Sequence, residues 1–157
     1  VKMKHKDYME MAINEGEKAY REKEIPVGAV IVKDGLILAA SHSLKEALHD
    51  PTAHAEMLAI REASRILQDW RLYGCTLYVT LEPCSMCASA ILQARIDTLV
   101  YGARDLERGA IESKGRVLDN NVYGHNINVY GGIMEEACNQ LLIDFFNNLR
   151  NSKKTLD

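Results

Sequence analysis

The stretch CTLYVTLEPCSMCASAILQA, residues 75–94, decides the fold of this 157-residue chain. Its first part is rich in β-branched and aromatic side chains, which predicts a buried strand over 75–81. Pro83 and two cysteines follow, and the apolar segment after them predicts a helix that ends near Ala94. A buried strand that leads into a helix is the repeating unit of α/β proteins.

The flanking segments predict further strands and helices. VGAVIV (27–32) and LILAAS (36–41) are apolar enough for two buried strands, and the Asp34-Gly35 pair between them is typical of a tight hairpin turn. The other predicted elements are a helix over 4–22, strands over 98–103 and 127–131, and a last helix over 134–150. Together they predict a three-layer α/β/α sandwich with a central mixed five-stranded sheet. Without repeats or linkers, residues 1–157 are expected to form a single domain.

One more helix is predicted to start at Asp50-Pro51, because aspartate is a favoured N-cap and proline a favoured first helical residue. It is expected to end near Leu67. The residues predicted to face the core are Ala55, Leu58, Ala59 and Ile66. Two polar residues, His54 and Glu56, lie near the start of this otherwise apolar segment.

Composition restricts the class of protein. Apolar residues make up 47% and charged residues 26% of the chain, which is ordinary for a globular protein. The net charge of −3 argues against a chain-wide electrostatic hold on nucleic acid, although it leaves room for a local basic patch. No apolar run approaches the roughly 20 residues that a membrane span needs. The four cysteines come without a signal-peptide core, so we expect thiols and a cytoplasmic protein.

Cys84 and Cys87 are the first candidate site. They are three residues apart at the start of a predicted helix, so they share a face. The positive end of the helix dipole lowers thiol pKa values there and favours thiolate. Both a zinc ligand pair and a redox-active dithiol need that environment, so the CxxC motif by itself leaves the two open.

His54 distinguishes between them. His54 and Glu56 are two residues apart, and on the side of a helix such residues point about 200° away from each other. At the tip of a helix, however, both side chains can reach a point ahead of the helix axis. If two helix tips meet, His54, Cys84 and Cys87 form a ligand set for tetrahedral Zn²⁺ that leaves the fourth position to water. Glu56 would then be the base beside that water, taking and giving protons in turn, with a raised pKa. The pattern H-x-E followed by P-C-x-x-C is typical of zinc nucleobase deaminases.

Two other interpretations of the motif are weaker. A thioredoxin-like dithiol does not account for the HAE segment upstream of the cysteines. A structural zinc site closed by His42, His49 or His125 leaves Glu56 unexplained. The remaining thiols, Cys75 and Cys138, are predicted to be ordinary core residues.

With these motifs the chain resembles the bacterial tRNA adenosine deaminases (TadA) over nearly its whole length. The matching segments are IPVGAVIV (25–32), DPTAHAE (50–56), TLYVTLEPC with MCA (76–88), RI (95–96), YGARD (101–105), GGI (131–133) and LLIDFFNNLR (141–150). The resemblance implies the cytidine deaminase-like fold, bound zinc, conversion of the wobble adenosine in a tRNA anticodon to inosine, and a homodimer.

The resemblance also implies roles for individual residues. His54, Cys84 and Cys87 match the zinc ligands, and Glu56 matches the proton shuttle. The residues that match substrate contacts are Glu24, Pro26 and Val27 along the base pocket, Asp105 at the RNA backbone, and Arg150 on the tRNA-binding terminal helix. Many free-base deaminases have phenylalanine at the position of Val27, so the IPVGA segment favours the tRNA branch.

Two departures from the family concern the substrate. Ser43 occupies the position of an asparagine that hydrogen-bonds the target nucleoside, and serine offers fewer donors and acceptors than an amide. GAIESKGRVLDN (109–120) replaces a G-S-L-M-N type stretch that supports RNA binding. A changed buried polar partner can switch substrate strongly, so a free nucleobase or nucleoside (guanine, cytosine or adenosine) is the alternative substrate. A non-catalytic RNA-binding role is disfavoured because Glu56 is intact.

Overall fold

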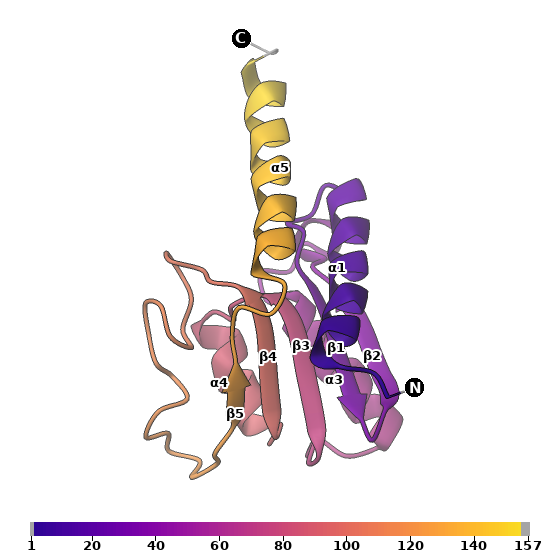
Figure 1. Cartoon of the computed structure of the whole chain (residues 1–157), viewed down its shortest axis with the longest axis vertical. Helices are drawn as coiled ribbons and strands as arrows, with labels where there is room; N and C mark the ends of the chain where they lie inside the picture. Colours follow the sequence, from indigo (N-terminus) through magenta and orange to yellow (C-terminus); the bar gives the residue numbers. More distant parts are fainter. Residues whose placement is uncertain (1, 155–157) are drawn as a thin grey trace.

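The computed structural model describes residues 2–154, and Figure 1 shows their single twisted sheet with helices on both faces. The strands are β1 (Gly28–Lys33), β2 (Leu36–His42), β3 (Cys75–Leu81), β4 (Thr98–Ala103) and β5 (Asn128–Tyr130), in the spatial order β2-β1-β3-β4-β5. The pairs β1–β2 and β1–β3 are antiparallel, whereas β3–β4 and β4–β5 are parallel. The predicted mixed five-stranded sheet is confirmed.

Helices cover both faces of the sheet. They are α1 (His5–Arg21), α2 (Lys45–Leu48), α3 (Ala55–Leu67), α4 (Ser85–Gln93) and α5 (Glu135–Lys154). Successive strand side chains point to opposite faces, so Val30 of β1 packs in a core with residues of α1 and α5, including Met9 and Cys138. Ile31 packs in a second core with residues of α3 and α4, including Ala59. These two cores give the predicted three layers.

The hairpin between β1 and β2 forms as predicted. Its two central residues, Asp34 and Gly35, both have positive φ values, of 50° and 76°. This is the backbone of a type I′ turn, whose twist matches that of the flanking strands. β2 therefore folds back along β1, and the chain returns to the edge of the sheet where β3 will also end.

The parallel pairing of β3 with β4 places two loops at one edge of the sheet. Leu81 at the end of β3 is paired with Ala103 at the end of β4. The segments that follow these residues therefore start side by side, although α4 and β4 separate them in the sequence. Parallel strands bring their carboxyl ends to the same edge, where α/β proteins form their sites.

The start of α3 differs from the prediction. Asp50 does not cap a helix; its Oδ1 accepts hydrogen bonds from the backbone N–H and the hydroxyl of Thr52, at 2.8 and 2.7 Å. This local turn competes with helix formation, so α3 begins only at Ala55. Ile66, predicted to be buried, lies in the last turn of α3 and is 48% exposed. The short helix α2 was not predicted.

The last helix is longer than predicted and extends beyond the sheet (Figure 1). Its outer part exposes Ile143, Phe146 and Leu149. Between residues 2 and 154, no helix combines the length and the apolar character that crossing a membrane requires.

Candidate active site

Two helices on the same face of the sheet begin at the same point. His54 is the N-cap residue of α3, with φ −72° and ψ 152°, and Cys84 is the N-cap residue of α4, with φ −74° and ψ 176°. Cys87 lies in the first turn of α4. The extended backbone at both N-caps directs these side chains beyond the helix ends. The structure therefore brings the three predicted metal ligands together.

The three side chains have the spacing of a zinc site. His54 Nδ1 lies 3.7 Å from Cys84 Sγ and 3.5 Å from Cys87 Sγ, and all three ligand atoms are within 4.8 Å of one another. Zn–N and Zn–S bonds of about 2.1 and 2.3 Å at the tetrahedral angle require N···S distances of about 3.6 Å. The donor set and its geometry thus fit zinc with three protein ligands, which leaves one coordination position for water or substrate.

The electrostatics of the site favour the thiolate form of Cys84. Hydrogen bonding from the Cys87 thiol, helped by His54, lowers the pKa of Cys84 to about 3 against the opposing effect of burial. Hydrogen bonding to Cys84 raises the pKa of His54. The pKa of Cys87 is raised by its contact with Cys84 and by burial near Glu56. A bound Zn²⁺ would stabilise both cysteines as thiolates, because zinc binding displaces thiol protons.

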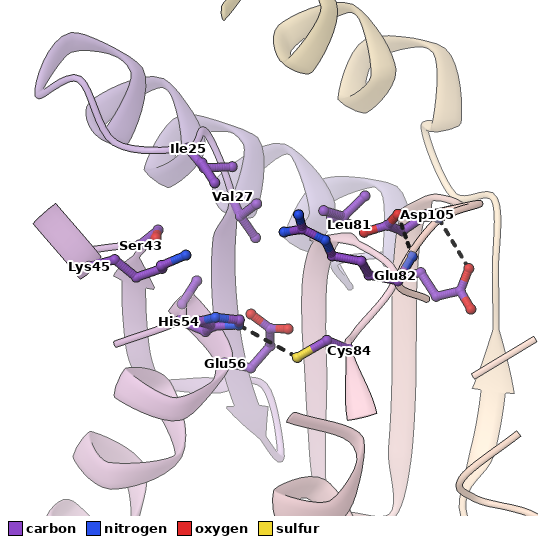
Figure 2. A pocket seen from close by; sticks show the side chains of 12 residues that line it. Ile25, Val27, Ser43, Lys45, His54, Glu56, Leu81, Glu82, Cys84 and Asp105 are labelled. Carbon is purple, nitrogen blue, oxygen red and sulfur yellow. Dashed lines mark hydrogen bonds between the residues drawn. The ribbon is translucent and has the colours of Figure 1, made fainter. Parts of the chain in front are cut away.

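Glu56 is the acid–base candidate of the site. Its side chain comes from the first turn of α3 and is 4% exposed. Burial raises the pKa of its carboxyl, as expected for a group that must both take and give a proton. Figure 2 shows the carboxyl between His54 and Cys84, facing the same space as these two ligands.

A pocket opens over these residues (Figure 2). Its inner end is formed by His54, Glu56 and Cys84, and its walls come from the segment before β1, the end of β2 with α2, the end of β3, and the loop after β4. The wall residues are Ile25, Val27, Ser43, Lys45, Ala55, Leu81, Glu82, Asp105 and Arg108. The site is therefore assembled from five separate parts of the sequence.

Comparisons with known proteins agree with this arrangement. Residues 2–103 match the family described as the cytidine and deoxycytidylate deaminase zinc-binding region. The chain belongs to this zinc-binding deaminase family. A tRNA-specific adenosine deaminase of Bacillus subtilis is 45% identical over 147 residues, which cover 94% of this chain and 91% of the relative. The resemblance to tRNA adenosine deaminases is thus confirmed.

Solved structures show the same deaminase fold. A structure from studies of A-to-I editing by tRNA:A34 deaminases has a TM-score of 0.83 and 45% identity, and the match covers 86% of this chain and 98% of that one. A guanine deaminase of Bacillus subtilis has a TM-score of 0.64 and 33% identity, covering 71% of this chain and 82% of the other. The cofactor of this deaminase family is zinc, and His54, Cys84 and Cys87 are the residues that fit it.

The predicted substrate residues lie at different distances from the pocket. Val27, Ser43 and Asp105 line it. Pro26 is buried beside it but is not part of its wall, because side chains alternate along an extended segment and Ile25 and Val27 face inward. Arg150 is exposed in the outer part of α5, outside the pocket.

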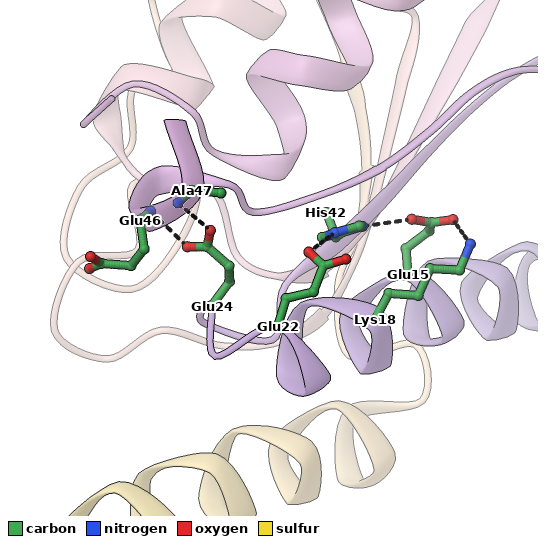
Figure 3. A network of polar contacts seen from close by, with 7 residues as sticks. All are labelled: Glu15, Lys18, Glu22, Glu24, His42, Glu46 and Ala47. Carbon is green, nitrogen blue, oxygen red and sulfur yellow. Dashed lines mark hydrogen bonds and ion pairs between the residues drawn. The ribbon is translucent and has the colours of Figure 1, made fainter. Parts of the chain in front are cut away.

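Glu24 was also predicted to contact the substrate, but its side chain lies outside the pocket. Its side chain is 1% exposed and does not line the pocket. Its two carboxylate oxygens accept hydrogen bonds from the backbone N–H groups of Glu46 and Ala47, at 2.8 and 2.9 Å (Figure 3). Glu24 therefore holds α2, whose first residue, Lys45, is in the pocket wall.

A second contact attaches the end of α1 to the same wall. His42, the last residue of β2, lies between Glu15 and Glu22, with Nδ1···Oε2 and Nε2···Oε2 distances of 3.0 and 2.8 Å (Figure 3). Lys18 in turn donates a hydrogen bond to Glu15 at 2.8 Å. This network fixes the backbone immediately before Ser43.

Sequence reasoning missed three charged residues of the pocket wall, Lys45, Glu82 and Arg108. Lys45 and Arg108 belong to a short helix and a loop without periodic patterns, so no sequence signal marks them. Glu82 stands directly before Pro83 and Cys84, and its position next to the metal motif was a usable signal. Burial acts to raise the pKa of Glu82, but hydrogen bonds from the loop after β4, chiefly from Glu112 and Ser113, keep it below its ordinary value.

Proposed function

We propose that this protein is a zinc-dependent hydrolytic deaminase that converts adenosine to inosine at the wobble position of a tRNA anticodon, with release of ammonia. The observation that carries the proposal is the buried Glu56 carboxyl beside the His54, Cys84 and Cys87 ligand set at the inner end of the pocket. The adenosine substrate is supported by relatives named tRNA-specific adenosine deaminases in Bacillus subtilis and Aquifex aeolicus.

In this mechanism Glu56 moves the protons. When bound, zinc supplies a Lewis acid that makes a water molecule nucleophilic near neutral pH. Glu56 accepts a proton from the attacking water and delivers it to the ring nitrogen next to the amino-bearing carbon, which makes this carbon electrophilic. The C–O bond forms, Glu56 transfers the second proton to the amino group, and the C–N bond breaks to release ammonia. Raised basicity of the buried carboxyl suits both transfers.

The pocket wall supports a substrate within a polynucleotide. Lys45 and Arg108 bring two cationic side chains to a site whose chemistry acts on a neutral base. Within residues 2–154 neither side chain forms an ion pair. Phosphates that flank an unstacked nucleotide are suitable partners, and single-stranded loops present bases in this way.

A free nucleobase or nucleoside is the second candidate substrate. Ser43 is 5% exposed and lines the pocket, and its short hydroxyl gives the site fewer hydrogen-bond partners for a nucleoside than an asparagine would. The similarity to a guanine deaminase structure supports the same alternative.

Ammonia release from zinc-loaded protein tests the proposal. The substrates are an anticodon stem-loop with adenosine at the wobble position, the same stem-loop with guanosine there, and free guanine, cytosine, adenine and their nucleosides. We expect turnover of the adenosine stem-loop alone, and a kcat lowered at least about 10²-fold in a zinc-loaded Glu56→Gln variant. Turnover of a free base or nucleoside alone would contradict the tRNA substrate and establish the alternative.

We also propose that the chain works as one cytoplasmic deaminase domain and as a homodimer. A cytoplasmic location agrees with the free cysteines of the chain, because thiols stay reduced in that compartment. For the homodimer, the apolar residues Ile91 and Leu92 of α4 are unavailable because they are buried in the core of their own chain. Trp70 and Tyr123 are exposed around Arg95 and offer an aromatic surface instead. Light scattering of wild type and Trp70→Ala measures the mass directly.

A further inference from the structure

Glu82 is a buried acidic residue that the proposed chemistry does not use. It follows β3 directly, precedes Cys84 by two positions, and is 2% exposed. Ionised groups are rarely buried so deeply unless several hydrogen bonds compensate for the lost hydration. The position of Glu82 therefore depends on its partners.

Within residues 2–154, all hydrogen-bond partners of the Glu82 side chain lie on one loop, residues 105–113. Oε1 accepts hydrogen bonds from the backbone N–H of Asp105 at 3.2 Å and from the hydroxyl of Ser113 at 2.5 Å. Oε2 accepts from the backbone N–H groups of Ile111, Glu112 and Ser113 at 3.1, 2.9 and 3.0 Å. The carboxylate thus joins the first and last residues of the loop.

The loop packs closely around this carboxylate. A Cβ atom added at Gly109 would lie 2.4 Å from the Glu82 carboxyl carbon, so only glycine fits there. Backbone hydrogen bonds tie the same two segments together, from Glu82 N to Ala103 O at 2.8 Å and from Ala110 N to Pro83 O at 2.9 Å. The loop has no regular helix or strand. These contacts therefore determine its conformation together with hydrogen bonds inside the loop, such as those from the N–H groups of Glu107 and Arg108 to Asp105 Oδ1 at 3.1 and 3.0 Å.

The same loop supplies one wall of the pocket. Asp105, the first anchor point, and Arg108, which lies between the anchor points, both line the pocket. Glu82 therefore connects the strand that leads to the metal ligand Cys84 with the loop that faces the substrate. The zinc ligands themselves make no hydrogen bond with the Glu82 side chain.

We propose that Glu82 is a positioning residue for substrate binding: it fixes residues 105–113 as the wall that receives the polynucleotide. The inference rests on the proposed tRNA substrate. In this proposal Glu56 and the zinc-ligand set perform the chemistry. Glu82 affects the substrate affinity, because it positions Asp105 and Arg108.

Hydrogen exchange and kinetics of a zinc-loaded Glu82→Gln variant test the proposal. The amide keeps the size of the side chain but places an N–H₂ group against backbone N–H donors. We expect the backbone amides of 105–113 to exchange at least about tenfold faster, with exchange in 54–58 unchanged and zinc retained. KM for the stem-loop should rise about tenfold, while kcat stays within about threefold of wild type. This pattern is expected when the lost interaction binds the ground state and the transition state equally.

Two further variants control this experiment. Glu107→Gln makes the same chemical change on an exposed side chain of the same loop, and its exchange and KM should not exceed wild-type values. Ser113→Ala removes one donor and should give a smaller rise in KM, with little additional effect in the Glu82→Gln background. If Glu82→Gln does not fold, Ser113→Ala alone still tests the loop.

Opposite outcomes would overturn the proposal. Unchanged exchange in 105–113 would mean that Glu82 does not order the loop. A lower kcat at unchanged KM, or loss of zinc, would place its role at the metal ligands. The exchange measurement needs no substrate, so it remains decisive for the loop even if wild type does not deaminate the stem-loop and the proposed function fails.

Discussion

Replacement of Glu24 by alanine tests how the wall formed by Ser43 and Lys45 is held. The Glu24 carboxylate accepts two backbone hydrogen bonds, at 2.8 and 2.9 Å, and is 1% exposed. Each hydrogen bond to a charged acceptor contributes about 1.5–3 kcal/mol. Because α2 has no buried residue, water can reach the freed N–H groups, so the lower end of this range applies.

The expected loss for Glu24→Ala is therefore about 3 kcal/mol, twice the lower value for one bond. For a chain of this size that corresponds to a fall in Tm of about 6–12 °C. Glu24→Gln should lose about half as much free energy, because the amide oxygen can still accept one of the two hydrogen bonds.

Urea denaturation of the zinc-loaded protein measures these free energies, and a constant m-value shows that the unfolded state is unchanged. Glu46→Gln is the matched control, because this neighbouring glutamate contributes only its backbone N–H to the contact and its exposed side chain should matter by less than about 0.5 kcal/mol. The reasoning fails if Glu24→Ala is within about 0.5 kcal/mol of wild type, or if Glu46→Gln is equally destabilising.

Three other predictions follow from the site. Burial acts to lower the pKa of His42, but hydrogen bonds with Glu15 and Glu22 raise it above 6.5. Protonated His42 therefore stabilises the fold fully below pH 6.5, and this stabilisation is lost as pH rises through the pKa of the folded state. The loss of unfolding free energy in His42→Ala, measured by urea denaturation, should be larger at pH 6 than at pH 9. Equal losses at the two pH values would contradict this prediction. Arg108→Ala and Lys45→Ala should each weaken stem-loop binding and reduce the slope of log K against log[salt] by about 0.7, whereas unchanged slopes would exclude phosphate contacts. Removal of zinc by a chelator should abolish turnover. It should also lower the unfolding free energy by about 2.7 kcal/mol relative to protein with zinc at 100 times its Kd. An unchanged Tm would contradict the assignment of the ligands.

The outcomes for individual residues show which parts of the prediction depended on local sequence. The Asp34-Gly35 turn was predicted correctly because positive φ at both central residues is a property of these residue types. The start of α3 was predicted wrongly because Asp50 had two local options, and its side chain bonds Thr52 instead of capping a helix. Cys75 and Cys138 are buried core residues, as predicted.

The sequence by itself predicted the strands, most of the helices, and His54, Cys84, Cys87 and Glu56 as candidates for the site, because periodicity and motif spacing are encoded over short distances. Only the tertiary structure decided which side chains meet around that centre. Glu24 and Glu82 are single glutamates without a periodic pattern, and their partners lie 22 to 31 residues away in the sequence. The pairing of Leu81 with Ala103 places the loop after β4 beside Glu82, and this long-range contact cannot be read from any one segment.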